Sequence, residues 1–294
     1  MTLGLASAVG VVVAGGAGYE LIEHGVLPGK LRLDELLGYC TVPSPPLRFD
    51  PVGPTRTGTF FSSARRRVVG YSIAWPPGHG PGSLLPLVVF LHGEGGDHLN
   101  ATVTMTPAQL VALRVRGAPL PPTAVVTVDG GTGYWHPHPG DDPMGMVVNE
   151  LIPRCRRIAL GKPDQGIGVM GISMGGYGAI TMAESHRRLF RVVAAISPAI
   201  WTSYDQARNV NAAAYSDAAE FAAYDAVTHA ASLGDIPVRV AAGNNDPFQP
   251  GVVALAKVLP KSAEVVLEGG CHTGSFFTAQ EPPSIEFIAS HLAS

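Results

Sequence analysis

A series of short apolar runs, separated by segments with helical spacing, most constrains the fold of this chain. The runs read PLVVFLH, TAVVTVDG, QGIGVMG, RVVAAIS, PVRVAAG and AEVVLEG, in that order. Continuous apolar runs of this length are typical of strands that are buried on both faces of a sheet. Because they alternate with helical patterns, they predict an α/β fold with a mostly parallel central sheet and helices on both faces.

Other segments place further elements around this sheet. Residues 67–75, RVVGYSIAW, predict an additional strand. Residues 106–117, TPAQLVALRVRG, predict a helix that begins near Pro107 and ends at Gly117. Residues 141–158 have apolar side chains at helical spacing, and Pro153 predicts a kink or break inside that helix.

The N-terminal part differs from the rest of the chain. Residues 3–18 are uncharged and apolar, and residues 41–58 are rich in proline, so we divide the chain into 1–58 and a catalytic domain at 59–294. The apolar segment is short for a membrane span and has no basic residue before it, because the first is Lys30. We expect an export signal or a loose membrane or envelope anchor there. A docked helix in a cytoplasmic protein is the alternative.

Charge and cysteine content exclude several classes of protein. Of the 294 residues, 15% are charged, the net charge is -3, and no basic stripe extends beyond residues 65–67, which argues against nucleic-acid binding. Cys40, Cys155 and Cys271 form no C-x-x-C pair, so no zinc or redox signature is present. One disulfide, for example Cys40–Cys155, is compatible with the sequence, which does not determine the pairing.

The stretch GVMGISMGGYGAI places Ser173 between Gly171 and Gly175, where an apolar strand ends and a helix begins. This G-x-S-x-G context is the one that a nucleophile elbow requires. The strained turn exposes the serine hydroxyl, and the glycines remove side chains that would collide with the neighbouring strand or helix. Ser173 is therefore the candidate nucleophile. A packing turn with an incidental serine is the alternative.

A serine nucleophile needs a base and a group that orients the base, in the chain order Ser, Asp or Glu, His. Asp246 follows the strand VRVAAG, and His272 follows the strand AEVVLEG in a glycine-containing loop. Both come just past the carboxyl ends of strands, where α/β sheets build their sites. We expect Asp246 and His272 to complete a catalytic triad, with Asp129 and Asp235 as the next candidates for the acid.

Two further stretches carry polar and aromatic residues. The segment YWHPHPGDD contains His136 and His138, but no second ligand set is evident, so we expect no metal and no cofactor. Tyr134 and Trp135 are expected to form walls of the substrate pocket. The thirty or so residues after Ser197 are where such enzymes insert a lid, and Trp201 would give it an apolar inner face.

The motifs LHGEGGD, VDGGTGYW, GISMGGYGA, DPF and GCHTGSFF, in this order, resemble the α/β-hydrolase superfamily, and within it the esterase D and antigen 85-like esterases. The resemblance covers residues 67–294. It implies an α/β-hydrolase fold, the triad Ser173, Asp246 and His272, and an oxyanion hole formed by the backbone N–H groups of Glu94 and Met174.

Glu94 departs from these relatives, which usually carry a neutral or basic residue there. A carboxylate facing the hole would oppose the transition state, so we expect its side chain to point to solvent or to pair with an arginine.

The resulting prediction is a serine esterase that hydrolyses carboxylic esters of small molecules or lipids through an acyl-enzyme on Ser173. An acyltransferase that uses the same acyl-enzyme is one alternative, because the sequence does not show whether water or an alcohol enters the second step. A non-catalytic binding protein of the same fold is the other.

Overall fold

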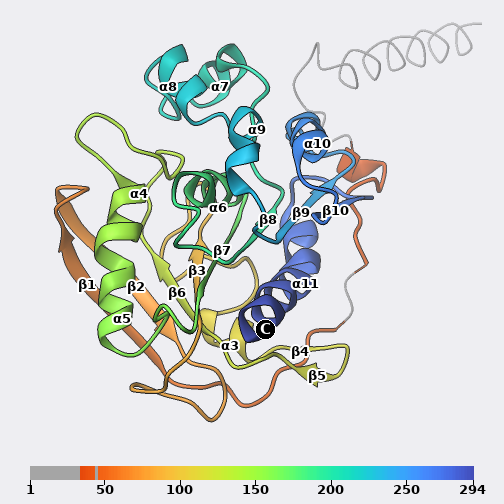
Figure 1. The fold of residues 1–294 in the computed structure, drawn as a ribbon. Helices are drawn as coiled ribbons and strands as arrows, with labels where there is room; N and C mark the ends of the chain where they lie inside the picture. The colour runs from red at the N-terminus through yellow and green to blue at the C-terminus, as the bar shows by residue number, and fades with distance from the viewer. Residues whose placement is uncertain (1–33, 44–45) are drawn as a thin grey trace, which may run out of the picture.

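The computed structural model describes residues 34–43 and 46–294 of the chain (Figure 1). The apolar segment at 3–18, and with it the expected export signal or anchor, lies outside the described residues. Among the helices of the described part, none is both long enough and apolar enough to cross a membrane.

An eight-stranded sheet forms the centre of the molecule, and its spatial order is β1-β2-β6-β3-β7-β8-β9-β10. Its strands are β1 (Thr55–Ser62), β2 (Arg67–Ala74), β3 (Leu87–Leu91), β6 (Ala124–Val128), β7 (Ile167–Ile172), β8 (Val192–Ile196), β9 (Val238–Gly243) and β10 (Glu264–Glu268). Strand β2 runs antiparallel to both of its neighbours, β1 and β6, and all other adjacent pairs are parallel. The predicted mostly parallel sheet is confirmed.

Helices cover both faces of this sheet, as predicted. On β3, Leu87, Val89 and Leu91 pack into one hydrophobic cluster, whereas Val88 and Phe90 pack into the other. The first cluster includes residues of several helices, among them α5 (Ile152–Arg157), α6 (Met174–Ser185) and α10 (Gln249–Val258). The second includes residues of α3 (Pro107–Val111) and α11 (Gly274–Ala293). Strands that are buried on both faces in this way explain the continuous apolar runs of the sequence.

The prediction of a helix over residues 106–117 was wrong for the second half of that segment. Helix α3 ends at Val111, and the chain then forms the hairpin β4 (Arg114–Val115) and β5 (Ala118–Pro119). Arg116 and Gly117 both adopt positive φ angles at the turn of this hairpin. Two consecutive residues with positive φ are typical of a tight hairpin turn, which a helix cannot contain.

The helix predicted over residues 141–158 forms, and the irregularity expected at Pro153 is a π-helical turn. The segment consists of α4 (Pro143–Gly145), the π-helix η1 (Met146–Leu151) and α5. The N–H of Ile152 donates to the carbonyl of Val147, five residues earlier, directly before the proline. Proline clashes with the carbonyl four residues earlier and has no N–H to donate, so a local change of hydrogen-bond spacing accommodates it.

An insertion of short helices separates β8 from β9. It consists of α7 (Tyr204–Val210), α8 (Ala218–Ala223), α9 (Ala226–His229) and the 3₁₀-helix η2 (Ala230–Leu233). In Figure 1, α7 and α8 stand above α6 and away from the sheet. This arrangement agrees with the lid-like insertion expected after Ser197.

The disulfide joins Cys40 to Cys271, 231 residues later, so the pairing Cys40–Cys155 considered above was wrong. Cys155 lies in α5 with its side chain in the core as a free thiol, and burial raises its pKa to about 12. Helical spacing placed Cys155 on the buried face of an amphipathic helix, and a side chain there cannot reach the surface segment that carries Cys40.

Candidate active site

Ser173 occupies the sharp turn between β7 and α6. Its φ of 55° and ψ of -119° are strained for a residue with a side chain. The turn is fixed on both sides of the serine: its N–H donates to the carbonyl of Ile196, and its carbonyl accepts from the N–H of Ala199. Met174 is the first residue of α6, so its N–H has no acceptor within that helix.

The two glycines beside Ser173 meet the steric demand expected from the sequence. A Cβ on Gly171 would overlap the backbone of Gly175, and a Cβ on Gly175 would overlap the carbonyl oxygen of Leu91 at the end of β3. Helix α6 therefore lies directly against the adjacent strand. This close approach holds Ser173 in its strained conformation.

Asp246 and His272 lie in the loops that follow β9 and β10, the two neighbouring strands at this edge of the sheet. The Asp246 side chain is fully buried, and its Oδ1 accepts a hydrogen bond from the N–H of Phe248. The two loops are tied together, because the N–H of Asn245 donates to the carbonyl of Gly270. The turns thus hold the carboxylate and the imidazole at adjacent positions.

The three predicted residues form one hydrogen-bonded chain. Ser173 Oγ lies 2.8 Å from His272 Nε2, and His272 Nδ1 lies 2.9 Å from Asp246 Oδ2. Since a carboxylate only accepts, Nδ1 carries the proton of the neutral imidazole, and Nε2 presents its lone pair to the serine hydroxyl. The rings of Phe248 and Phe277 each lie 5.0 Å from the imidazole ring and restrict its orientation.

A cleft of about 530 Å³ opens at Ser173 and His272. Its lining consists of Gly93, Glu94, Gly95, Gly96, Asn100, Ala101, Thr102, Val103, Ile172, Ser173, His272 and Phe277. The glycine loop after β3 thus forms one wall beside the serine, as its position after an early strand predicted. A volume of this size is typical of a small-molecule site.

His92 holds this glycine loop in place, a role that the sequence reasoning did not assign. Its side chain is fully buried. Its Nδ1 lies 2.7 Å from the carbonyl oxygen of Gly93, and its Nε2 accepts from the N–H of Gly130. Burial lowers its pKa, which favours the neutral imidazole that this pattern of one donor and one acceptor requires. The signal in the sequence was a histidine directly at the end of a buried strand.

Within the described part of the chain, the side chain of Glu94 pairs with an amide and not with an arginine. Its Oε1 accepts a hydrogen bond of 3.0 Å from Nδ2 of Asn211, the residue that ends α7. Glu94 is exposed and lies at the rim of the cleft. Solvent or an arginine was the expected surrounding of this side chain, and the partner found is the amide of Asn211 in the insertion.

The three predicted pocket residues, Tyr134, Trp135 and Trp201, are not among the side chains that line the cleft. Trp135 is fully buried, and its indole N–H donates to the carbonyl of His92. Tyr134 is also buried, and its hydroxyl accepts from the indole N–H of Trp201. Tyr134 and Trp135 lie in the loop after β6, which directs them into the core instead of toward the cleft. Trp201 follows β8 and packs partly buried against the same cluster.

The two alternative acids lie in other interactions. Asp129 accepts hydrogen bonds from the N–H groups of Gly70 and His98. Asp235 is exposed and pairs with Arg187. Neither carboxylate contacts His272.

The pair His136 and His138 has a third partner that the sequence did not reveal. Glu220 of α8 brings its carboxylate to both imidazoles, and the ligand atoms of the three residues lie within 4.8 Å of one another. Burial, followed by the charge of His138, lowers the pKa of His136 to about 4. Among the described residues, this is the one group of three or more such side chains that is able to hold a metal ion.

Comparisons with known proteins give a family and a fold. Residues 62–266 match the family model described as "Putative esterase". A solved ferulic acid esterase superposes with a TM-score of 0.69 at 16% identity and covers 81% of this chain and 98% of its own. An S-formylglutathione hydrolase from Agrobacterium tumefaciens gives a TM-score of 0.65 at 17% identity, with 84% and 98% covered. The fluorophosphonate-binding serine hydrolase F of Staphylococcus aureus gives 0.61 at 15% identity, with 81% and 99% covered. A search of curated protein sequences finds no match.

Proposed function

Since the chain belongs to this esterase family and is a serine hydrolase with the α/β-hydrolase fold, we propose that Ser173 is its nucleophile and that it cleaves carboxylic esters through an acyl-enzyme. The observation that carries the proposal is the hydrogen-bonded chain from Asp246 through His272 to Ser173 at the base of the cleft. A non-catalytic binding protein would have no need for a strained serine, an oriented imidazole and a buried carboxylate in contact.

In the first step, Ser173 Oγ attacks the ester carbonyl while its proton passes to His272 Nε2. The resulting imidazolium is stabilised by Asp246, which stays ionised. His272 then gives this proton to the departing alcohol oxygen as the C–O bond breaks. In the second step, the same Nε2 takes a proton from water as the water oxygen attacks the acyl carbonyl. The bond between the acyl carbon and Ser173 Oγ then breaks, His272 returns the proton to Oγ, and the acid is released.

Negative charge develops on the carbonyl oxygen in both steps. We assign its stabilisation to the backbone N–H groups of Met174 and Glu94. The first is at the N-terminus of α6, where the helix dipole adds to the effect. The second lies in the loop that His92 fixes. One such donor contributes about 3–4 kcal/mol to transition-state stabilisation in a studied hydrolase.

The cleft favours esters with small acyl groups. Its apolar side chains are Ala101, Val103, Ile172 and Phe277, and polar groups of Asn100 and Thr102 lie among them. A panel of p-nitrophenyl esters from acetyl to palmitoyl should therefore show its highest turnover at the short end. Adding a sugar acceptor to the panel tests acyl transfer: formation of a sugar ester in place of the free acid would contradict hydrolysis as the main reaction.

Labelling with a fluorophosphonate probe tests the nucleophile directly. Wild-type protein should gain one covalent adduct on Ser173, and Ser173→Ala should gain none while keeping the same circular dichroism spectrum and melting temperature. A folded wild-type protein that forms no adduct at Ser173 would overturn the assignment.

A further inference from the structure

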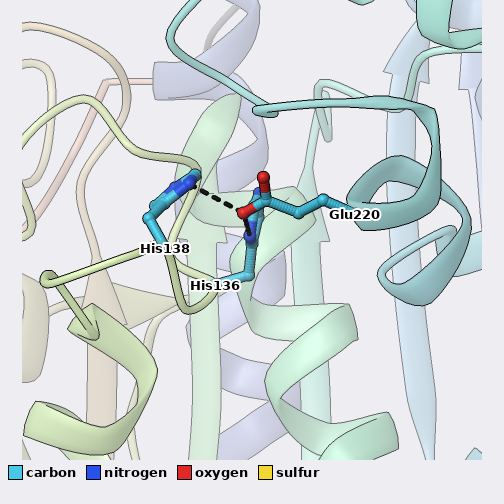
Figure 2. Close-up of side chains that lie close together, drawn as sticks. All are labelled: His136, His138 and Glu220. Carbon is cyan, nitrogen blue, oxygen red and sulfur yellow. Dashed lines mark ion pairs between the residues drawn. The ribbon is translucent and has the colours of Figure 1, made fainter.

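We propose that His136, His138 and Glu220 form a binding site for a divalent transition-metal ion such as Zn²⁺, which ties the helical insertion to the loop after β6. Figure 2 shows the two imidazoles on that loop and the carboxylate reaching them from α8. The site is separate from the catalytic residues, because none of the three side chains lines the cleft at Ser173.

The hydrogen bonds of the two histidines direct unprotonated nitrogens at the carboxylate. His136 Nε2 lies 2.8 Å from the carbonyl oxygen of Ala214, and His138 Nε2 lies 2.6 Å from that of Gly133. Since a carbonyl only accepts, Nε2 of His138 carries the proton, and its Nδ1 is left with a lone pair. His136 Nδ1 also lies 3.2 Å from the carbonyl oxygen of Pro137, but the shorter contact of Nε2 with Ala214 favours the same tautomer. A backbone carbonyl that fixes the ring in this way is the usual second partner of a metal-binding histidine.

Both of these lone pairs face the same carboxylate oxygen. Glu220 Oε1 lies 2.9 Å from His138 Nδ1 and 3.5 Å from His136 Nδ1. This oxygen is buried and has no hydrogen-bond donor within the described part of the chain, whereas Oε2 accepts from the N–H of Ser216. Three acceptors that converge in this way repel one another unless a cation lies between them. One proton satisfies a single pair, but a metal ion satisfies all three.

The spacing and the ligand types indicate which ions fit. Metal–ligand bonds of about 2.0–2.2 Å in a tetrahedral zinc site separate the ligand atoms by about 3.3 Å, and the separations of 2.9 and 3.5 Å lie on either side of this value. Two imidazole nitrogens and one carboxylate suit Zn²⁺ and related transition ions, whereas Ca²⁺ and Mg²⁺ prefer oxygen ligands.

The surroundings hold the ligands in position. The ring of His136 is stacked between those of Tyr215 and Tyr224, with centroid distances of 4.9 and 4.6 Å. Both tyrosines belong to the insertion. The side chains of His138 and Glu220 keep 15% and 13% of their surface exposed, so an ion can reach them from solvent.

Metal titration of the full chain, stripped with a chelator, tests the proposal. Zn²⁺ measured by calorimetry should bind with one ion per chain at this site, and Co²⁺ should give the visible absorption of a low-coordinate complex. His138→Asn and Glu220→Gln should weaken Zn²⁺ binding at least about 100-fold, since even loss of a supporting partner costs about 10–100-fold. His79→Asn removes a histidine elsewhere and should bind as wild type does.

Thermal unfolding supplies a second readout that does not depend on activity. Zn²⁺ should raise the melting temperature of the wild type and of His79→Asn, but not of the two site variants. Glu220→Gln keeps an oxygen for the Ser216 N–H, so its fold should be retained. The proposal is wrong if the wild type does not bind Zn²⁺. It is also wrong if His138→Asn and Glu220→Gln bind Zn²⁺ as tightly as the wild type does. In either case His138 and Glu220 form an ion pair only.

Discussion

At the scale of single residues, the site depends on side chains that are each held by a specific backbone group. Asp246 is held by the N–H of Phe248, and the glycine loop is held by His92. These groups let one hydroxyl, one imidazole and one carboxylate meet at hydrogen-bond distance. In the proposed reaction the hydroxyl attacks, the imidazole moves the proton and the carboxylate only orients the imidazole. Replacing Ser173, His272 or Asp246 should therefore reduce activity by different amounts.

Asp246→Asn should reduce kcat less than His272→Ala does. The amide of asparagine keeps the acceptor for Phe248, but it no longer stabilises the imidazolium and it favours the wrong tautomer. In a studied hydrolase, loss of the acid costs roughly 10⁴-fold and loss of the nucleophile or base roughly 10⁶-fold. Steady-state kinetics with a p-nitrophenyl ester measure both. Equal kcat in wild type and Asp246→Asn would move the acid to another residue.

Glu94→Gln should leave kcat/KM within about fivefold of wild type, since an exposed interaction contributes about 0–1 kcal/mol. The glutamine side chain keeps an oxygen to accept from Asn211, and only the backbone N–H of residue 94 serves the proposed oxyanion hole. The pH profile of kcat/KM is the deciding measurement. A clear rise in kcat together with a shift of the profile to lower pH would mean that the carboxylate faces the oxyanion.

At the scale of helices and strands, the elements that could be predicted from the sequence are those whose residues are buried. Strand β3 could be recognised because both of its faces are buried, which leaves an uninterrupted apolar run. Strand β1, by contrast, reads TRTGTFFS and is largely exposed at the sheet edge, so its sequence gives no such signal. After α3 ends, Arg114 pairs with Asp50, a contact between distant segments that no local pattern encodes.

The same reasoning explains which site residues could be predicted. Ser173, Asp246 and His272 each follow a recognisable strand, and their order along the chain is diagnostic. Asn211 and Glu220 come from the insertion between β8 and β9, and only the docking of that insertion brings them to Glu94 and to the two histidines. Trp135 was misplaced because a motif gives the position of a residue along the chain but not the direction of its side chain.

Helix α11 contains a buried acid that should make stability depend on pH. The Glu281 side chain is fully buried, its Oε1 accepts from the N–H of Val103 on the cleft wall, and burial raises its pKa from 4.5 to about 7. Between these two values the folded chain binds more protons than the unfolded chain. The contribution of Glu281 to the free energy of unfolding is therefore fully present below about pH 4.5 and is lost as the pH rises through about 7.

Glu281→Gln should remove the part of the pH dependence that Glu281 causes. Relative to wild type, the variant should gain up to about 3 kcal/mol in the free energy of unfolding between about pH 5 and about pH 8. Urea unfolding at the two pH values measures the difference. Glu286→Gln is the control. It removes another acid of α11, one that is paired with Arg116 of the β4–β5 hairpin. A Glu281→Gln variant whose stability relative to wild type is constant across this range would contradict the assignment.

At the scale of the whole molecule, one disulfide bond joins the first described segment to the loop that carries His272. Cys271 directly precedes His272, and its disulfide to Cys40 ties the segment before the sheet to the last loop before α11. Since disulfides persist in oxidising compartments, the bridge supports the expectation that the chain is exported, which stays a prediction.

Cys40→Ser should lower the free energy of unfolding by about 2–5 kcal/mol, because the bridge closes a very long loop in the unfolded chain. Dithiothreitol should destabilise the wild type and Cys155→Ala by a similar amount, and Cys40→Ser should not respond to it. Urea unfolding with and without dithiothreitol measures the free energy of unfolding of the three proteins. If reduction left the wild type unchanged, the bridge would not contribute to stability.

The order of the three thiols along the chain also sets a requirement on biosynthesis. During synthesis Cys155 emerges long before Cys271, so for most of that time it is the one thiol with which Cys40 is able to react. Correct pairing therefore requires that α5 bury Cys155 against the growing sheet before an oxidant reaches Cys40, or that an isomerase later correct the premature bond. In either case the loop that carries His272 is fastened only after all strands of the sheet have been synthesised, because Cys271 follows the last of them.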